Sequence, residues 1–309
     1  MKSLLLFALI SPLFSQAQYF SGEITYEISI ISKSDTVDVQ KIVDSRHGTT
    51  ASYIITAQHY KSTYLKNGQY NYSYTYDDET KRMFDDYAEK PYVTFRDSRR
   101  ANVQYQGSEI HKDSAMIILG YNCYLVKRDA ESSTTKTYYS EDIKVDYADF
   151  EGHKVGAWYD KLKEVDGALP LKIITEYETY FSIREAVQVN ERKVKTKEFK
   201  LPNKPVVAAY SALDSRAELQ KPTREQMQCY QQKLATVSKP AGEKYTSYIR
   251  FVLQKDGKIE FVEPHEKDEE GFFRVAIDII QHCGLQFSPG KIEGKPVESE
   301  VYFPIEFLR

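Results

Sequence analysis

Residues 62–76 read STYLKNGQYNYSYTY, and this stretch is the clearest local structural signal in the chain. Two alternating runs flank Asn67-Gly68, a dipeptide that supplies the positive φ angles of a type I′ turn. The stretch therefore predicts a β-hairpin. Because side chains two residues apart in a strand point to the same side, we expect the second strand to carry four tyrosines on one face: Tyr70, Tyr72, Tyr74 and Tyr76.

The tyrosine row has two interpretations. Its members could line an apolar cavity together with Phe84 or Phe95, or they could cover the side of a barrel. Tyrosine suits both roles, because it packs an apolar ring and keeps its hydroxyl in water. We favour the covering role and leave the cavity open as the alternative.

Short alternating runs continue on both sides of the hairpin, through residues 18–201. A period of two is typical of strands. We expect strands at residues 24–30, 37–42, 53–55, 115–119, 121–128, 134–140, 171–180, 181–189 and 192–199. Helical turns are expected only at residues 79–87 and 149–163.

Length and composition limit the classes of protein that the chain can be. It has 309 residues, about twice the length of a typical domain, which predicts two domains. Its 41% hydrophobic and 28% charged residues are ordinary for a globular protein. Lys and Arg number 42 and Asp and Glu 45, so no broad basic field is available to hold a phosphate backbone. We expect no nucleic-acid partner.

The first 17 residues have the features of a secretory signal. Lys2 supplies the positive start, residues 4–14 are apolar, and Ser15-Gln16-Ala17 offers small residues for cleavage. A membrane anchor is the alternative, but the apolar stretch contains Pro12 and is shorter than the ~20 residues that span a bilayer. We expect a mature chain that begins at Gln18 and is soluble in the periplasm or elsewhere in the exported cell envelope.

Residues 202–222 change character, with three prolines among small and charged residues. We expect a connector here, with a short helical segment at 208–219 and a second domain at 223–309. That domain reads as helix, strand, strand, helix, strand. Thr223 is a plausible N-cap, Asp256-Gly257 is a hairpin turn, and residues 273, 276, 277 and 280 form a helical stripe before the last strand at 297–307.

The chain has three cysteines, Cys123, Cys229 and Cys283. An exported protein can form disulfides, but an odd number leaves at least one thiol free. A bridge between Cys229 and Cys283 is one possibility and three packed thiols are the other. The sequence does not decide between them.

The second domain contains FVLQKDGKI at 251–259, FSPGK at 287–291, GKPV at 294–297 and FPIEF at 303–307. In this order and spacing, the blocks resemble the C-terminal domain of TonB-type proteins over residues 224–309. The resemblance implies a small αββαβ unit. It also implies binding of an outer-membrane or periplasmic protein by strand addition, since such domains pair a sheet edge with an extended segment of a receptor.

The first domain contains GEITY at 22–26, ILGYNC at 118–123, YYSEDI at 138–143 and GALPLK at 167–172. Together these segments resemble the GLPGLI and related families of exported Bacteroidota proteins, whose fold is similar to the lipoprotein-carrier half-barrel. The expected fold class is therefore α+β, with a mostly antiparallel β half-barrel followed by the TonB-like unit.

No motif for catalysis or metal binding stands out. The six histidines are scattered, the glycines of residues 290–295 are too close together for a phosphate loop, and no Gly-x-Ser-x-Gly elbow is present. The acidic groups at residues 77–79, 85–86 and 268–270 fit solvated loops. We expect no metal, no cofactor and no enzymatic activity.

Two functional hypotheses remain. In the first, a non-enzymatic cell-envelope protein uses the last strand as an exposed edge for a partner, possibly in outer-membrane transport; the residues concerned are Ser299, Glu300, Val301, Tyr302, Phe303, Ile305 and Phe307. In the second, the half-barrel carries a lipid or another apolar small molecule on the tyrosine row. A homodimer is compatible with either hypothesis.

Overall fold

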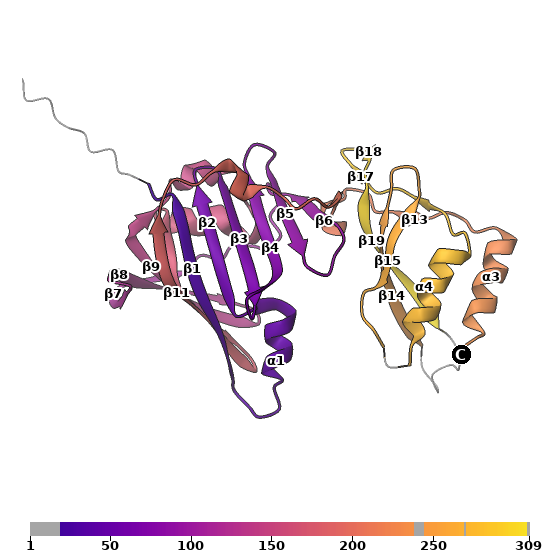
Figure 1. Cartoon of the computed structure of the whole chain (residues 1–309), viewed down its shortest axis with the longest axis horizontal. Coiled ribbons are helices and arrows are strands. Elements are labelled where there is room, and N and C mark those ends of the chain that lie inside the picture. The colour runs from indigo at the N-terminus through magenta and orange to yellow at the C-terminus, as the bar shows by residue number, and fades with distance from the viewer. Residues whose placement is uncertain (1–18, 238–243, 269, 308–309) are drawn as a thin grey trace, which may run out of the picture.

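The computed structural model describes residues 19–237, 244–268 and 270–307, so the expected leader at residues 1–17 lies outside the described residues. The fold is α+β and mostly β. Figure 1 shows two units, each built on a sheet, that meet at one side. Within the described residues, no helix is long and apolar enough to cross a membrane.

The N-terminal unit is built from eleven strands and a few short helical segments. The strands are β1 (Gly22–Ser32), β2 (Thr50–Thr56), β3 (His59–Lys66), β4 (Gln69–Asp77), β5 (Arg82–Tyr87), β6 (Val93–Asp97), β7 (Glu109–Ile118), β8 (Tyr121–Ala130), β9 (Ser133–Lys144), β10 (Ala168–Tyr177) and β11 (Tyr180–Glu191). The helical segments are α1 (Val39–Ile42), η1 (Val43–His47), η2 (Tyr147–Phe150), η3 (Val155–Ala157), α2 (Trp158–Glu164) and η4 (Thr196–Phe199).

The rest of the chain forms the C-terminal unit and the junction. Its strands are β12 (Val206–Ala208), β13 (Glu218–Leu219), β14 (Tyr245–Leu253), β15 (Ile259–Pro264), β16 (Phe287–Ser288), β17 (Lys291–Ile292), β18 (Lys295–Pro296) and β19 (Ser299–Phe307). Its helices are η5 (Tyr210–Ala212), α3 (Arg224–Leu234) and α4 (Phe272–His282).

One hydrogen-bonded sheet runs through both units. Its order is β15-β14-β19-β12-β6-β5-β4-β3-β2-β1-β11-β10-β9-β8-β7. Neighbouring strands are antiparallel except at β12, which is parallel to β6 on one side and to β19 on the other. β12 therefore joins the edge of one unit to the edge of the other.

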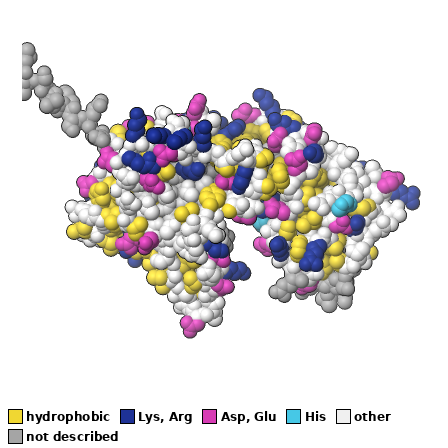
Figure 2. Space-filling view, in the orientation of Figure 1, with side chains coloured by type: hydrophobic (Ala, Val, Ile, Leu, Met, Phe, Trp, Pro, Cys, Tyr) yellow, Lys and Arg dark blue, Asp and Glu magenta, His cyan; other side chains and the backbone are white. Residues whose placement is uncertain are grey.

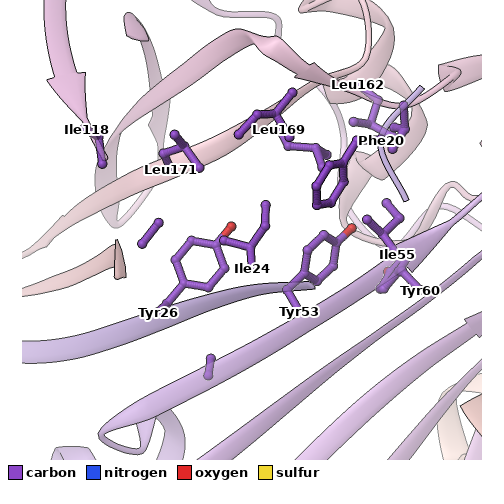
Figure 3. Close-up of a cluster of buried hydrophobic side chains, with 14 of the residues drawn as sticks. Phe20, Ile24, Tyr26, Tyr53, Ile55, Tyr60, Ile118, Leu162, Leu169 and Leu171 are labelled. Atoms are coloured by element: carbon purple, nitrogen blue, oxygen red, sulfur yellow. The ribbon is translucent and has the colours of Figure 1, made fainter. Parts of the chain in front are cut away.

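The N-terminal core lies on one face of the sheet, which we call the inner face. Ile24 and Tyr26 of β1 and Tyr53 of β2 point from this face toward Leu169 and Leu171 of β10 (Figure 3). The Tyr26 hydroxyl donates to the carbonyl oxygen of Pro170 at 2.7 Å. β1 and β10, which are separated by β11 in the sheet order, thus share one core.

The β3–β4 hairpin confirms the first prediction but changes the tyrosine row. Tyr64 pairs with Tyr72, whereas the next residue, Leu65, pairs with Tyr70. Asn71 is therefore an extra, bulged residue, and a bulge reverses the side to which the following side chain points. The prediction of four tyrosines on one face is wrong, because Tyr70 faces away from the core and donates to Asp86.

The C-terminal unit has its own core, made of the inward side chains of β14 and β19 and the buried side of α4. Thr223 caps α3 as expected: its hydroxyl accepts from the backbone N–H of Gln226, whose side chain in turn accepts from the N–H of Thr223. Cys229 of α3 and Cys283 after α4 are joined in a disulfide, and Cys123 is a buried free thiol.

The connector at residues 202–222 is ordered β structure and turns. The helical segment expected at 208–219 is wrong, because only η5 has helical character and β12 and β13 flank it. Val207 and Ala208 are fully buried, since they fill the seam between the two sheet edges. The segment therefore forms part of both units.

Three further local predictions are wrong. Residues 37–42 form the turn of α1 because the Asp38 carboxylate caps the N–H of Lys41. Residues 79–87 contain β5, after a turn in which Asp77 accepts from Glu79. Residues 192–199 end in η4, where Arg192 pairs with Glu198 and folds the chain back. The helical turns expected at 149–163 are confirmed.

Candidate functional site

Four tyrosines on the inner face of the N-terminal sheet form the first candidate surface. Cross-strand pairing sets Tyr64, Tyr72 and Tyr87 side by side on β3, β4 and β5, with Tyr74 on the next level of β4. The rings of Tyr64 and Tyr72 stack with centroids 4.3 Å apart, and those of Tyr72 and Tyr87 are 5.7 Å apart. We call these four residues the tyrosine face.

The tyrosine face is only partly covered by the core. Tyr64 is buried, whereas Tyr72, Tyr74 and Tyr87 keep part of their surface in contact with solvent. Burial raises the pKa of Tyr72 and of Tyr74, so both hydroxyls stay protonated and can donate hydrogen bonds at any physiological pH. The surface thus offers flat apolar rings with neutral donors.

A cation lies at one end of this row. The guanidinium of Arg184, on β11, reaches across β1 and β2 to lie 5.0 Å from the ring centroid of Tyr64. On the intervening strand β2, the residue that pairs with Tyr64 is Ala51, which also pairs with Tyr26 of β1. Its small side chain leaves room for the arginine to reach Tyr64. At the other end, the ammonium of Lys90 lies 5.2 Å from the ring of Tyr87.

Deeper in the core, His153 is held in a closed aromatic cluster. Its Nε2 is 2.6 Å from the Tyr60 hydroxyl, its Nδ1 is 2.5 Å from the Ser98 hydroxyl, and its ring stacks on Tyr76. Burial lowers the pKa of His153 to about 3. Only 1% of His153 is exposed, so no substrate can approach this serine–histidine contact. The cluster is part of the core.

The structure separates the six residues predicted to line an apolar face. Tyr72, Tyr74 and Tyr76 lie on the inner face, although Tyr76 is fully buried. Tyr70, Phe84 and Phe95 lie on the outer face. Tyr70 does so because of the bulge. Phe84 pairs with Thr75 of β4, which alternates with the inward-facing Tyr74 and Tyr76, and Phe95 pairs with Phe84. The prediction of one continuous surface is wrong.

The outer face of the same strands is covered by the chain itself. The ammonium of Lys204 lies 2.8 Å from the Asp86 carboxylate and 2.9 Å from the carbonyl oxygen of Tyr87. The ring of Phe199 packs 5.5 Å from that of His59. Residues 196–205 therefore run across the outer face toward β12, and the accessible side of the tyrosine row is the inner one.

The last strand, expected to be an exposed or weakly covered edge, is covered by the chain itself at its start. β19 lies between β14 and β12, and the N–H of Ala208 donates to the carbonyl of Glu298 at 2.8 Å. The connector thus closes this edge at Ser299, and among the described strands none pairs with that side of β19 beyond it. The seven residues predicted to bind a partner serve the protein's own packing: Val301, Phe303, Ile305 and Phe307 join the core, Ser299 and Glu300 are buried at the junction, and Tyr302 contacts Tyr210 and His265.

A buried ion pair crosses the junction beside this strand. The Lys90 ammonium lies 2.6 Å from the Glu300 carboxylate, which also accepts from the Tyr92 hydroxyl at 3.0 Å. Burial, together with the Glu300 charge, raises the pKa of Tyr92. Phe261 packs 5.8 Å from the Tyr92 ring and adopts a positive φ of 53°, which is costly for a bulky residue. The junction is thus a specific contact.

A groove beside β15 is the second candidate surface. It has a volume of about 420 Å³ and lies between the edge strand and the end of α4, with Ile259, Val262, Ile280 and Leu285 among its lining residues. In the described part of the chain, β15 pairs only with β14. A bulge at Phe261 and Val262 interrupts the pairing of β15 with β14.

No metal centre emerges from the described ranges. Within them, no group of three or more His, Cys, Asp or Glu side chains is placed to hold an ion. The acidic groups singled out from the sequence make other contacts: Asp85 pairs with Arg96, Asp86 with Lys204, and Asp268 caps the start of α4. Acidic and basic side chains are interspersed on the face shown in Figure 2.

No protein-family model and no curated protein sequence matches the chain. Among solved structures, PNGF-II is similar over 77% of this chain and 44% of its own length, at 12% identity and a TM-score of 0.40. This chain thus spans less than half of that protein. A DNA polymerase III beta chain from Streptococcus pneumoniae aligns over 92% of this chain and 91% of its own, at 6% identity and a TM-score of 0.09. Likenesses this weak carry no argument about function.

The sequence reasoning missed Arg184, Lys90 and Tyr92. A basic residue on the core side of a strand is the signal that could have revealed Arg184, since Ser182 and Ala186 share its face. Lys90 and Glu300 are 210 residues apart, and no local pattern relates them. Their contact exists only because β12 brings the two sheet edges together.

Proposed function

We propose that this protein is a non-enzymatic binding protein of the cell envelope that holds an apolar or amphipathic small molecule on its tyrosine face. The observation that carries the proposal is the stacked row Tyr64–Tyr72–Tyr87, two members of which remain partly exposed on the core side of the sheet. Aromatic rings that served the core alone would contribute most to stability if they were fully buried. Here Tyr72 and Tyr87 extend the row past the buried core to a surface that solvent reaches.

The wider setting of the proposal comes from the sequence. The N-terminal unit resembles exported proteins with a half-barrel similar to that of lipoprotein carriers, and carriers of this shape bind apolar ligands on their concave face. The expected signal at residues 1–17 would deliver the chain to the periplasm. We therefore propose a periplasmic carrier, with the half-barrel as its active part.

The test uses a neutral apolar dye whose fluorescence rises on binding, N-phenyl-1-naphthylamine. Tyr72→Ser removes the central ring of the stack, and Tyr70→Ser is its matched control, two residues away on the same strand but on the outer face. We expect Tyr72→Ser to weaken dye binding roughly tenfold or more, as loss of a stacked aromatic contact does. Tyr70→Ser should bind as the wild type does. Equal losses in both variants, or no binding by the wild type, would contradict the proposal.

A second candidate function belongs to the C-terminal unit. Its resemblance to TonB C-terminal domains suggests binding of an extended segment of an outer-membrane or periplasmic protein, and the groove beside β15 is the observation that favours it. Because β12 occupies the start of the β19 edge, we place the partner at β15 instead. The groove is lined by both polar and apolar residues, and its apolar members, Ile259, Val262 and Leu285, would contact side chains of that segment.

Site-specific photo-crosslinking tests whether the partner lies in the β15 groove. A crosslinker at Val262 lies in the groove, whereas one at exposed Tyr248 of β14 lies outside it. We expect a defined adduct in envelope extracts from position 262 and none from position 248. Matching adducts at both positions would mean that the groove is not the binding surface.

A further inference from the structure

Arg184 differs from the other partly buried arginines. Four of these have a carboxylate partner: Arg96 pairs with Asp85, Arg128 with Glu164, Arg192 with Glu23 and Glu198, and Arg250 with Glu263. Among the arginines whose side chains the structure describes, Arg184 is the partly buried one without such a partner. Its positive charge on the inner face is therefore not balanced by the protein.

The surroundings of Arg184 make this lack of a partner costly. Its cross-strand neighbours are Ile28 on β1 and Ile173 on β10, neither of which can accept a hydrogen bond from it. Its Nε is buried without a partner. A buried cation normally has a counter-charge, because its desolvation is otherwise uncompensated. The site therefore has an unused capacity to bind an anion.

Neutral donors stand around the guanidinium. The titratable groups that act on it are Tyr64, Tyr74, Tyr72 and Tyr26. The Tyr26 hydroxyl already donates to the Pro170 carbonyl oxygen, whereas the hydroxyls of Tyr64 and Tyr74 lie 3.4 Å apart. The Tyr53 hydroxyl, from the adjacent level of β2, is buried with no hydrogen-bond partner. The nearby carboxylate on the tyrosine-bearing strands, Asp85, is already paired with Arg96. A guanidinium among phenolic donors suits an oxyanion.

We propose that Arg184 binds an oxyanion, the carboxylate or phosphate head of an amphiphile whose apolar part lies along the tyrosine face. This inference rests on the proposed function and specifies its ligand. Because the guanidinium lies over Tyr64, the first ring of the stack, an anion held there directs an attached chain over Tyr72 toward Tyr87. Head and tail thus have separate sites on one surface.

The first test compares three probes with the same 16-carbon chain: palmitate, hexadecyl phosphate and neutral hexadecanol. Each displaces the neutral dye N-phenyl-1-naphthylamine from the full chain, which gives its affinity. We expect one or both anionic probes to bind roughly 10- to 100-fold more tightly than hexadecanol, the factor of a charge-assisted hydrogen bond. The difference between palmitate and hexadecyl phosphate identifies which head the site prefers.

Variants assign the preference to Arg184. Arg184→Gln should abolish the preference for the anionic probes over hexadecanol, whereas Arg184→Lys should retain part of that preference. Arg82→Gln is the control, because Arg82 is an exposed arginine that contacts Phe95 on the outer face. It should bind all three probes as the wild type does.

The outcomes separate this inference from the proposed function. If all three probes bind the wild type equally, the carrier function stands and the anion site is wrong. If none binds and the dye is not held, the proposed function fails. In that case the anion site is tested alone, by the nitrogen-15 resonance of the Arg184 Nε group during titration with acetate and with inorganic phosphate. A resonance that moves with neither ion would overturn the inference.

Discussion

The two units of this protein solve the problem of building a core in different ways. The N-terminal core mixes tyrosines with isoleucine and leucine, encloses buried His153 and a free thiol, and has several polar atoms hydrogen-bonded inside. The C-terminal core is made of phenylalanine, isoleucine, leucine and valine, and a disulfide closes it. The N-terminal core thus contains hydrogen-bonded polar rings, whereas the C-terminal core is mostly apolar, with Ser247 among its few buried polar side chains.

This difference shows where binding is chemically possible. A core of hydroxyl-bearing rings can continue to its surface as the tyrosine face, since each ring tolerates contact with water on one side. The buried rings of the C-terminal core are phenylalanines, which have no hydroxyl to present to water. The comparison predicts that the two units respond to different perturbations.

The disulfide should account for the largest difference. In the double variant Cys229→Ala/Cys283→Ala, we expect the C-terminal unit to lose about 4 kcal/mol of unfolding free energy, because the bridge closes a loop across 54 residues of sequence separation. Urea unfolding should show that transition moving while the transition of the N-terminal unit stays in place. If both transitions moved equally, the units would unfold as one and the contrast would fail.

The ion pair at the junction comes next. Lys90→Met should cost about 3 kcal/mol, because it leaves the Glu300 carboxylate buried without its counter-charge. Lys244→Met is the matched control: Lys244 pairs with Glu306 on the same strand, but both side chains are about half exposed. Its loss should cost less than about 1 kcal/mol. Similar losses in the two variants by urea unfolding would show that the junction pair is not special.

Acid should act on the N-terminal unit. The pKa of folded His153, about 3, lies below its ordinary value of 6.5, so the unfolded chain takes up a proton first as the pH falls. Stability from this group is complete above pH 6.5 and decreases below it, by about 2 kcal/mol between pH 7 and pH 5.

His153→Gln tests the source of the acid effect. Its control is His282→Gln, at an exposed position of α4. The free energy of unfolding is measured by urea at pH 7 and at pH 5. We expect the decrease to become much smaller in His153→Gln and to persist in His282→Gln. The opposite pattern would place the sensitivity outside the aromatic cluster.

The smallest effect compares two turns of the N-terminal sheet. Asn67-Gly68 and Leu119-Gly120 have the same pair of positive φ angles, 49° and 79° in the first turn and 51° and 86° in the second. Leucine is strained at this position and here is 48% exposed, so it gains little from packing. Leu119→Asn should raise stability by about 1 kcal/mol and Asn67→Leu should lower it by a similar amount. Thermal unfolding that leaves both unchanged would refute the argument.

The sequence predicted features that depend on neighbours along the chain. The turn at Asn67-Gly68, the cap at Thr223 and the helical turns at 149–163 each follow from local chemistry, and each is observed. The side to which Tyr70 points does not, because the bulge at Asn71 depends on how β3 and β4 pair over their whole length. One extra residue was enough to divide the predicted face.

Long-range features of the candidate site were beyond sequence reasoning for a related reason. Arg184 acquires its setting from β1, β2 and β3, which bring Ala51 and Tyr64 within reach of its side chain. The sequence predicted no cover for the start of the β19 edge, because the residues that pair with it come from a proline-rich segment interpreted as a connector. The three-residue strand Val206–Ala208 pairs with β6 on one side and with β19 on the other. Neither the periodicity nor the composition of the sequence indicates this double pairing.

The position of β12 has a mechanical consequence. A tensile load that passes along the backbone from the N-terminal unit to the C-terminal unit must enter β12, which is paired to β6 and to β19. Sliding or rotating one unit against the other first requires breaking those backbone hydrogen bonds and exposing Val207. The short strand therefore restricts the movement of one unit against the other, which a flexible linker would allow. A pull on the C-terminal unit would therefore pass from β12 to β6 and then to β5, the strand that carries Tyr87.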